Sequence, residues 1–95
     1  MVVDVTTFRL VDGAGEAEFL AADRRWQNEL VPHRDGFLRR TTARRDGEWV
    51  VITLWATEAA AGTFEDDTRG HEVRRAFDHY VAAESRRAAR YDTLD

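Results

Sequence analysis

The segment at residues 48–56, EWVVITLWA, constrains the fold of this chain more than any other. Its β-branched and aromatic residues predict a strand, in which successive side chains point to opposite faces of a sheet. One face then carries Trp49, Val51, Thr53 and Trp55, and the other carries Val50, Ile52 and Leu54. An antiparallel sheet with one solvated face alternates apolar with polar residues, and this strand does not. We therefore expect both faces of the sheet to be covered.

The rest of the chain alternates between strand and helix patterns. Further strands are predicted at 2–11, 36–44 and 85–94, with Asp-Gly turns after the first and second of them. At 15–30, the residues Phe19, Asp23, Trp26 and Leu30 recur at helical spacing and predict an amphipathic helix. Thr57 is suited to cap a short helix at 58–67, which Gly62 interrupts.

A second cap-like residue, Thr68, precedes a longer helix in which Val73, Phe77, Tyr80 and Val81 share a face with Glu84. The resulting order, β-α-β-β-α-α-β, predicts an α+β fold of the ferredoxin-like split βαβ type, with a four-stranded antiparallel sheet. Ninety-five residues without a linker or a repeat form a single domain over 1–95.

The expected partner is a second copy of the chain. Helices cover only one face of a four-stranded sheet, so the apolar residues on the other face need another cover, and a homodimer is the simplest one. Two sheets stacked face to face would form the dimeric α/β barrel. The period of the strand leaves open which of the two faces carries Trp49 and Trp55.

Composition narrows the classes of function. The net charge is −4, and the fourteen basic residues, all Arg, are interleaved with acidic ones, which disfavours nucleic-acid binding. The densest basic cluster, Arg39–Arg40 and Arg44–Arg45, fits a solvated edge strand. With no cysteine, no membrane-length apolar run and no signal-peptide pattern, we expect a cytoplasmic protein that does not bind membranes.

Four segments carry a family resemblance: DGFL at 35–38, DGEWVVITLW at 46–55, the W-x-T-E-A pattern at 55–59 and RAARYDTL at 87–94. Together with the order of elements, they resemble the antibiotic biosynthesis monooxygenase family of dimeric α/β-barrel proteins. The resemblance covers nearly the whole chain. It implies a pocket between the sheet and the helices, in which a small aromatic substrate of the polyketide or quinol type is oxygenated without a cofactor.

The chain departs from the family pattern at two places. Phe64 stands nine residues after Trp55, where many quinol-type members have a His, and the first strand reads TTFRL at 6–10, without the Asn of the haem-degrading relatives. Haem degradation is therefore disfavoured, and quinol oxygenation lacks one expected polar group.

Candidate site residues follow from the resemblance and from residue chemistry. His71 approximately matches a later His of the family and is a candidate pocket base, with Tyr80 as a second catalytic candidate. The predicted substrate-binding residues are Trp26, Phe64, Phe77, Trp55 and Arg9. The alternative is that the aromatic residues belong to the core or the dimer interface, while His71 and Arg9 lie at the surface. Three scattered His residues, with His33 and His79 expected in solvent, predict no metal site.

The functional prediction is a cofactor-independent monooxygenase acting on a small aromatic molecule. Two alternatives stay open. One is a non-catalytic ligand-binding or structural homodimer on the same scaffold, which Phe64 in place of His favours. The other is a polyketide cyclase or isomerase that uses the same pocket.

Overall fold

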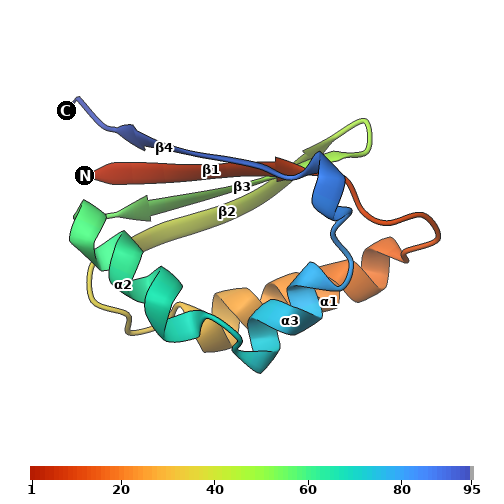
Figure 1. Ribbon diagram of the computed structural model, residues 1–95, viewed down its shortest axis with the longest axis horizontal. Coiled ribbons are helices and arrows are strands. Elements are labelled where there is room, and N and C mark those ends of the chain that lie inside the picture. The colour runs from red at the N-terminus through yellow and green to blue at the C-terminus, as the bar shows by residue number, and fades with distance from the viewer. Residues whose placement is uncertain (95) are drawn as a thin grey trace.

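Four strands form one antiparallel sheet in the order β2-β3-β1-β4 (Figure 1). The computed structural model describes residues 1–94. Its strands are β1 (Val2–Phe8), β2 (Phe37–Arg45), β3 (Glu48–Trp55) and β4 (Arg87–Asp92). The helices are α1 (Glu16–Arg25), a π-helix that directly continues it (η1, Trp26–Leu30), α2 (Glu58–Thr68), α3 (Glu72–Asp78) and a short 3₁₀ turn (η2, Ala83–Ser85). The predicted α+β, ferredoxin-like order of elements is confirmed.

The helices α1, α2 and α3 lie on the same side of the sheet (Figure 1). The side of β3 that faces them carries Trp49, Val51 and Trp55, each no more than 9% exposed. The ring of Phe19 from α1 lies 4.8 Å from the Trp49 ring, and the Phe8 ring from β1 lies 5.6 Å from Phe77 of α3. The two tryptophans of β3 therefore belong to the core under the helices, which answers the question left open by the sequence.

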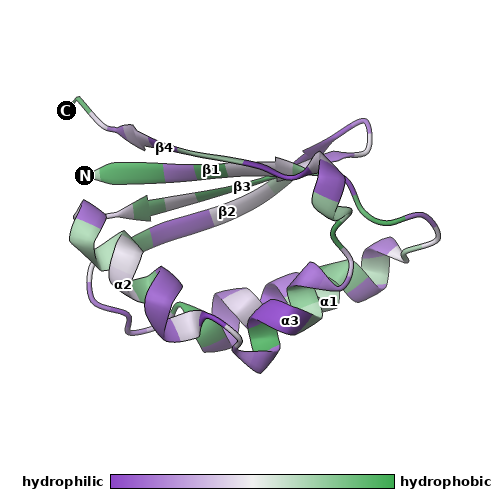
Figure 2. Cartoon of the chain, viewed as in Figure 1, coloured by the Kyte–Doolittle hydropathy of each residue, from purple (hydrophilic) through white to green (hydrophobic). Residues whose placement is uncertain are grey.

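The opposite side of the sheet has no helix over it (Figure 1). It carries Val50, Ile52 and Leu54 of β3 beside Val3 and Val5 of β1. Figure 2 shows the hydrophobic colour along β1 and β3 and hydrophilic residues along β2. As predicted, the Arg-rich strand β2 is an edge strand, so the apolar character of this side is concentrated on the two central strands.

The start of β2 is fixed by a glycine in close contact with α2. Gly36 has φ +78°, which a glycine adopts without strain, and a Cβ atom there would lie 2.5 Å from the Cβ of Ala60. The carbonyl of Gly36 accepts a hydrogen bond of 2.7 Å from the amide of Ala56, just after β3. The glycine of the DGFL segment is therefore explained by its close packing against α2 and by its positive φ.

The helix ends agree with the sequence at one cap and differ at the next. Thr57 caps α2 as predicted, because its Oγ1 accepts a 3.0 Å hydrogen bond from the amide of Ala60, but Gly62 does not interrupt the helix. The prediction that Thr68 caps the next helix is wrong. Thr68 is the buried last residue of α2 and donates to the carbonyl of Phe64, and α3 is capped by His71.

Helix α3 is also shorter than predicted, because the chain after it pairs with the segment after β1. Leu10 and Val81 form an isolated antiparallel bridge, and the amide of Ala82 donates to the carbonyl of Arg9 at 2.8 Å. The same pairing ends β1 at Phe8, three residues before the predicted end. No helix of residues 1–94 is long and apolar enough to cross a membrane.

Candidate functional site

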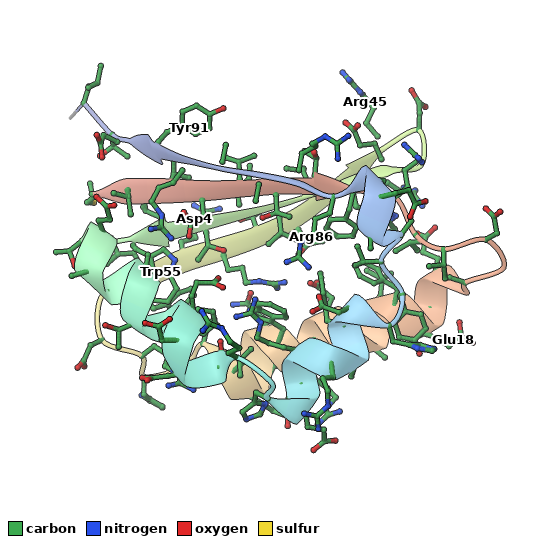
Figure 3. All side chains as sticks on the ribbon, in the orientation of Figure 1. Asp4, Glu18, Arg45, Trp55, Arg86 and Tyr91 are labelled. Atoms are coloured by element: carbon green, nitrogen blue, oxygen red, sulfur yellow. The ribbon has the colours of Figure 1, made fainter. Side chains whose placement is uncertain are left out.

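A cavity of about 340 Å³ lies between the helix-facing side of the sheet and the helices. Its floor comes from β1, β3 and β4, and its walls come from η1, α2, α3 and one residue of β2. Figure 3 shows Asp4, Trp55 and Arg86 on the helix side of the sheet, whereas Tyr91 points away on the other side. The volume is within the range of small-molecule sites.

Aromatic side chains from four different elements form one wall of the cavity. Trp55 ends β3, Phe64 comes from α2, Phe77 from α3, and Trp26 begins the π-helix that continues α1. The rings of Trp55 and Phe64 lie 5.0 Å apart, and those of Trp26 and Phe77 lie 4.9 Å apart. This wall is rigid, because all four residues are at most 8% exposed and each ring packs against another one.

A carboxylate–guanidinium pair lies on the sheet side of the cavity. Asp4 of β1 faces Arg90 of β4 across the antiparallel register. The Nε and Nη2 of Arg90 donate to the two carboxylate oxygens of Asp4 at 2.6 and 3.1 Å, a two-point geometry that carboxylates and guanidinium groups share. These hydrogen bonds raise the pKa of Arg90 above its usual value. Thr6 and Thr53 add hydroxyl groups to the same floor.

Two arginines lie over the Trp26 ring. The guanidinium carbons of Arg40 and Arg74 are 5.2 and 5.3 Å from its centroid, within cation–π range. The Nη1 of Arg74 also donates to Glu65 and to the hydroxyl of Thr68, both at 3.0 Å. These contacts tie α2, α3 and η1 together at the cavity wall.

Arg40 forms a buried ion pair with Asp23 of α1. Its Nη2 donates to the Oδ1 of Asp23 at 2.8 Å, and the hydroxyl of Thr42 donates to the same oxygen at 3.0 Å. The two side chains of the ion pair are 2% and 12% exposed. Burial lowers the pKa of Arg40 from its usual value, and the Asp23 carboxylate acts against that shift. The expectation that Arg40 belongs to a solvated edge is therefore wrong for this residue.

The structure brings together four of the seven predicted site residues. Trp26, Trp55, Phe64 and Phe77 all line the cavity, and their role in substrate binding stays a prediction. Arg9 lies outside the lining and is exposed, and its backbone amide donates to the hydroxyl of Ser85 at 2.8 Å.

Neither predicted catalytic residue lines the cavity. His71 is exposed, and its Nδ1 accepts a 3.1 Å hydrogen bond from the amide of Val73, which is the contact of a helix cap. Tyr80 is half-buried; its ring lies 6.4 Å from Phe19, and it lines a separate outer hollow between α1 and α3 together with His79. The catalytic roles of His71 and Tyr80 stay predictions, and the positions of the two residues outside the cavity do not support them.

The sequence did not predict the charged side of the cavity. Its charged lining residues are Asp4, Glu65, Arg40, Arg74, Arg86 and Arg90. One signal was present, since Asp23 stands among apolar residues on the inner face of the predicted helix and a buried carboxylate needs a cation. Among residues 1–94, no three His, Asp or Glu side chains gather as metal ligands would.

Solved structures with the same fold come from several bacteria. SnoaB, a cofactor-independent oxygenase from Streptomyces nogalater, has a TM-score of 0.81 and 18% identity, with 99% of this chain and 93% of that chain covered. A candidate antibiotic biosynthesis monooxygenase from Nitrosomonas europaea has a TM-score of 0.80 and 18% identity, and both chains are covered completely.

A monooxygenase from the gene ActVA-Orf6 of Streptomyces coelicolor, solved in complex with the ligand Nanaomycin D, has a TM-score of 0.73 and 21% identity, over 99% of this chain and 88% of that chain. No protein-family model and no curated protein matches the sequence. At these identities the likeness is one of fold. The chain therefore has the fold of antibiotic biosynthesis monooxygenase structures, as the resemblance in its sequence predicts.

Proposed function

We propose that this protein is a cofactor-independent monooxygenase that acts on a small aromatic molecule of the polyketide or quinol type. The observation that carries the proposal is the cavity of about 340 Å³ with its wall of four aromatic side chains. An interior of this kind suits a planar ring system, and a purely structural dimer would have no need to keep it open. The shared fold with a cofactor-independent oxygenase adds support.

The proposed reaction asks little of the protein beyond binding and proton transfer. A phenol or an anthrone that has lost a proton is electron-rich enough to pass an electron to dioxygen. In an anthrone the ring CH₂ becomes C=O, one oxygen atom of O₂ enters the product, and the other leaves as water. The aromatic wall excludes bulk water, and the arginines of the lining stabilise the negative charge that develops.

Glu65 is the proposed proton acceptor in the cavity. The lining contains two carboxylates, and both oxygens of Asp4 already accept hydrogen bonds from Arg90. In Glu65 only Oε2 is bound, by Arg74, and Oε1 has no hydrogen-bond partner among residues 1–94. Glu65, whose side chain is 47% exposed, therefore has a free acceptor at the cavity lining, which His71 and Tyr80 do not offer there.

Oxygen uptake tests the proposed function. We expect the purified protein to consume oxygen with anthrone or with a substituted hydroquinone, in a ratio of one O₂ per anthrone converted. Thr53→Phe, which places a ring in the cavity from its floor, should abolish that uptake while the protein stays folded. No uptake across a panel of anthrones and hydroquinones would overturn the proposal, and ligand binding without uptake would favour the non-catalytic alternative.

Glu65→Gln should lower kcat by about 10²- to 10⁴-fold, the usual contribution of a general base. The matched variant is His71→Asn, because asparagine keeps a side-chain acceptor for the capped amide of Val73 and removes the imidazole. We expect its kcat to equal that of the wild type. The opposite result, in which His71→Asn is inactive and Glu65→Gln is not, would return the catalytic role to His71.

The protein is also proposed to act as a homodimer, joined through the side of the sheet that no helix covers. Ile52, Leu38 and Tyr91 are 39%, 48% and 56% exposed, and a second copy of the same surface would bury the apolar residues of the central strands. Two sheets packed in this way leave both cavities on the outer sides of the stack, each under its own helices.

A further inference from the structure

Arg40 is the most deeply buried charged side chain at the cavity. It extends from the edge strand β2 toward the helices, its side chain is 2% exposed, and it lines the cavity. Its guanidinium carbon lies 5.2 Å from the centroid of Trp26 and 5.9 Å from that of Phe77. Because the two rings lie only 4.9 Å apart, the cation lies beside both of them at the cavity lining.

The hydrogen-bonding capacity of Arg40 is only partly used. Nη2 donates to Asp23, whereas Nε is fully buried and has no partner. Nη1 has no partner among residues 1–94 either, and it is not among the fully buried atoms, so it keeps accessible surface. Buried donors in folded proteins are nearly always satisfied, and an unsatisfied one calls for an explanation. Of the two free nitrogens, Nη1 is the donor that a ligand acceptor in the cavity can reach.

The other arginines of the lining do not combine these properties. Arg90 uses two nitrogens on the carboxylate of Asp4, and Arg74 is held by Glu65 and Thr68. Arg86 has one bond, to Asp78, but its side chain is 33% exposed and solvated. The cavity carboxylates Asp4 and Glu65 therefore have their own cations, and the free donors at depth belong to Arg40.

We propose that Arg40 is the anion-binding residue of the cavity, and that its ligand is an aromatic molecule bearing a carboxylate or a phenolate oxygen. The planar guanidinium group matches such oxygens in geometry, and the rings of the ligand would pack against the aromatic wall of the cavity. The inference rests on the proposed function in one respect, namely that the cavity is the substrate site. It adds the chemical class of the substrate and the residue that selects it.

Calorimetric titration with 2-naphthoate and its neutral analogue 2-naphthamide tests this selection. For the wild type we expect naphthoate to bind at least about ten-fold more tightly than naphthamide, the usual scale of a charge-assisted hydrogen bond. Arg40→Lys keeps the charge but loses the planar group, which can match a carboxylate at two points, so it should reduce that preference while leaving naphthamide affinity unchanged. If Arg40→Lys does not fold, the double variant Asp23→Asn/Arg40→Gln replaces it, because it removes both charges of the buried pair.

Two matched variants show whether the effect belongs to Arg40. Arg90→Lys changes a cavity arginine that has two of its nitrogens on the carboxylate of Asp4. Arg44→Lys changes an arginine that shares β2 with Arg40 and pairs with Glu16 over Trp49. Both should keep the preference for naphthoate. If Arg90→Lys lost as much of the preference for naphthoate as Arg40→Lys does, the preference would come from the summed positive charge of the cavity, and the assignment to Arg40 would be overturned.

Binding of a phenolate oxygen, the second ligand group proposed for Arg40, is tested with 4-nitrophenol, whose phenolate absorbs visible light. Binding to the wild type should raise the phenolate fraction at fixed pH, and binding to Arg40→Lys should raise it less. If Arg40→Lys weakens naphthoate binding, the ligand group is a carboxylate. If Arg40→Lys lowers the phenolate fraction of bound nitrophenol, the ligand group is a phenolate. If Arg40→Lys changes neither measurement, the inference is overturned.

Binding and turnover separate this inference from the proposed function. If no substrate supports oxygen uptake but naphthoate binding depends on Arg40, the proposed function fails and the inference holds. If uptake occurs and Arg40→Lys leaves KM unchanged for every anionic substrate, the function holds and the inference fails.

Discussion

Asp23→Ala should lower the free energy of unfolding by about 3–5 kcal/mol, the usual cost of removing one partner of a buried ion pair. The variant leaves the guanidinium group of Arg40 in place, with a side chain that is 2% exposed and no counter-charge. Thr42 also loses the acceptor of its hydroxyl. Because small domains have a total stability of about 5–15 kcal/mol, we expect a large loss of folded protein at moderate urea.

The measurement is urea unfolding followed by tryptophan fluorescence at a fixed protein concentration. Glu16→Ala is the matched control, since Glu16 and Arg44 also join α1 to β2 and their side chains are 49% and 47% exposed. Its expected cost is at most about 1 kcal/mol. The double variant Asp23→Leu/Arg40→Met, which replaces the pair by apolar side chains, should recover most of the lost stability. If Asp23→Ala and Glu16→Ala lowered the free energy of unfolding equally, the buried ion pair would stabilise the fold no more than the exposed one.

The fold was predictable from this sequence because period and turn chemistry agree along most of the chain. The helix at 15–30 has one clear period, and the strand at 48–56 is a run of β-branched and aromatic residues; both exist with nearly the predicted bounds. Period alone does not say which face of β3 meets the helices. That choice depends on partners far away in sequence: Trp49 and Trp55 lie opposite Phe8 and Val2 of β1, and Phe19 packs against Trp49.

The helix that ends early shows the same limit. The apolar residues at 73–81 fit one long helix, but the pairing of Leu10 with Val81 draws the chain out of it after Asp78. This contact spans seventy-one residues of sequence, and no local pattern reports it. The same bridge places Tyr80 away from the cavity, in the outer hollow. The wrong length predicted for the helix and the position of Tyr80 outside the cavity therefore both follow from the pairing of Leu10 with Val81.

The aromatic half of the cavity was predictable and the charged half was not. Large apolar residues on inner faces mark the core and the cavity wall alike, so Trp26 and Phe77 were found by period. Arg40 stands in a run of arginines that has the composition of a solvated edge. Alternation groups Arg40 with Thr42 and Arg44 on one face, and an irregular register between Phe37 and Arg39 precedes them, but only the approach of α1 makes that face buried.

Ile52→Asp should convert a dimer into a monomer, the second large effect that we expect. Ile52 lies opposite Val5 in the centre of the side of the sheet that no helix covers, so its partner in a face-to-face dimer would be another apolar surface. A carboxylate buried there without a partner would cost more than the apolar contacts supply. In sedimentation, the wild type should have a mass near twice 10.9 kDa at micromolar concentration, and Ile52→Asp a mass near 10.9 kDa.

The control for the added charge is Ala21→Asp, at an exposed position of α1 in the outer hollow between α1 and α3. It should sediment as the wild type does, and circular dichroism should show that both variants remain folded. Because the cavity lies under the helices and not at the proposed interface, monomeric Ile52→Asp should still bind 2-naphthoate. A monomeric wild type would contradict the homodimer, and a dimeric Ile52→Asp would place the interface on another surface. Loss of naphthoate binding together with the dimer would mean that the partner subunit helps to form the site.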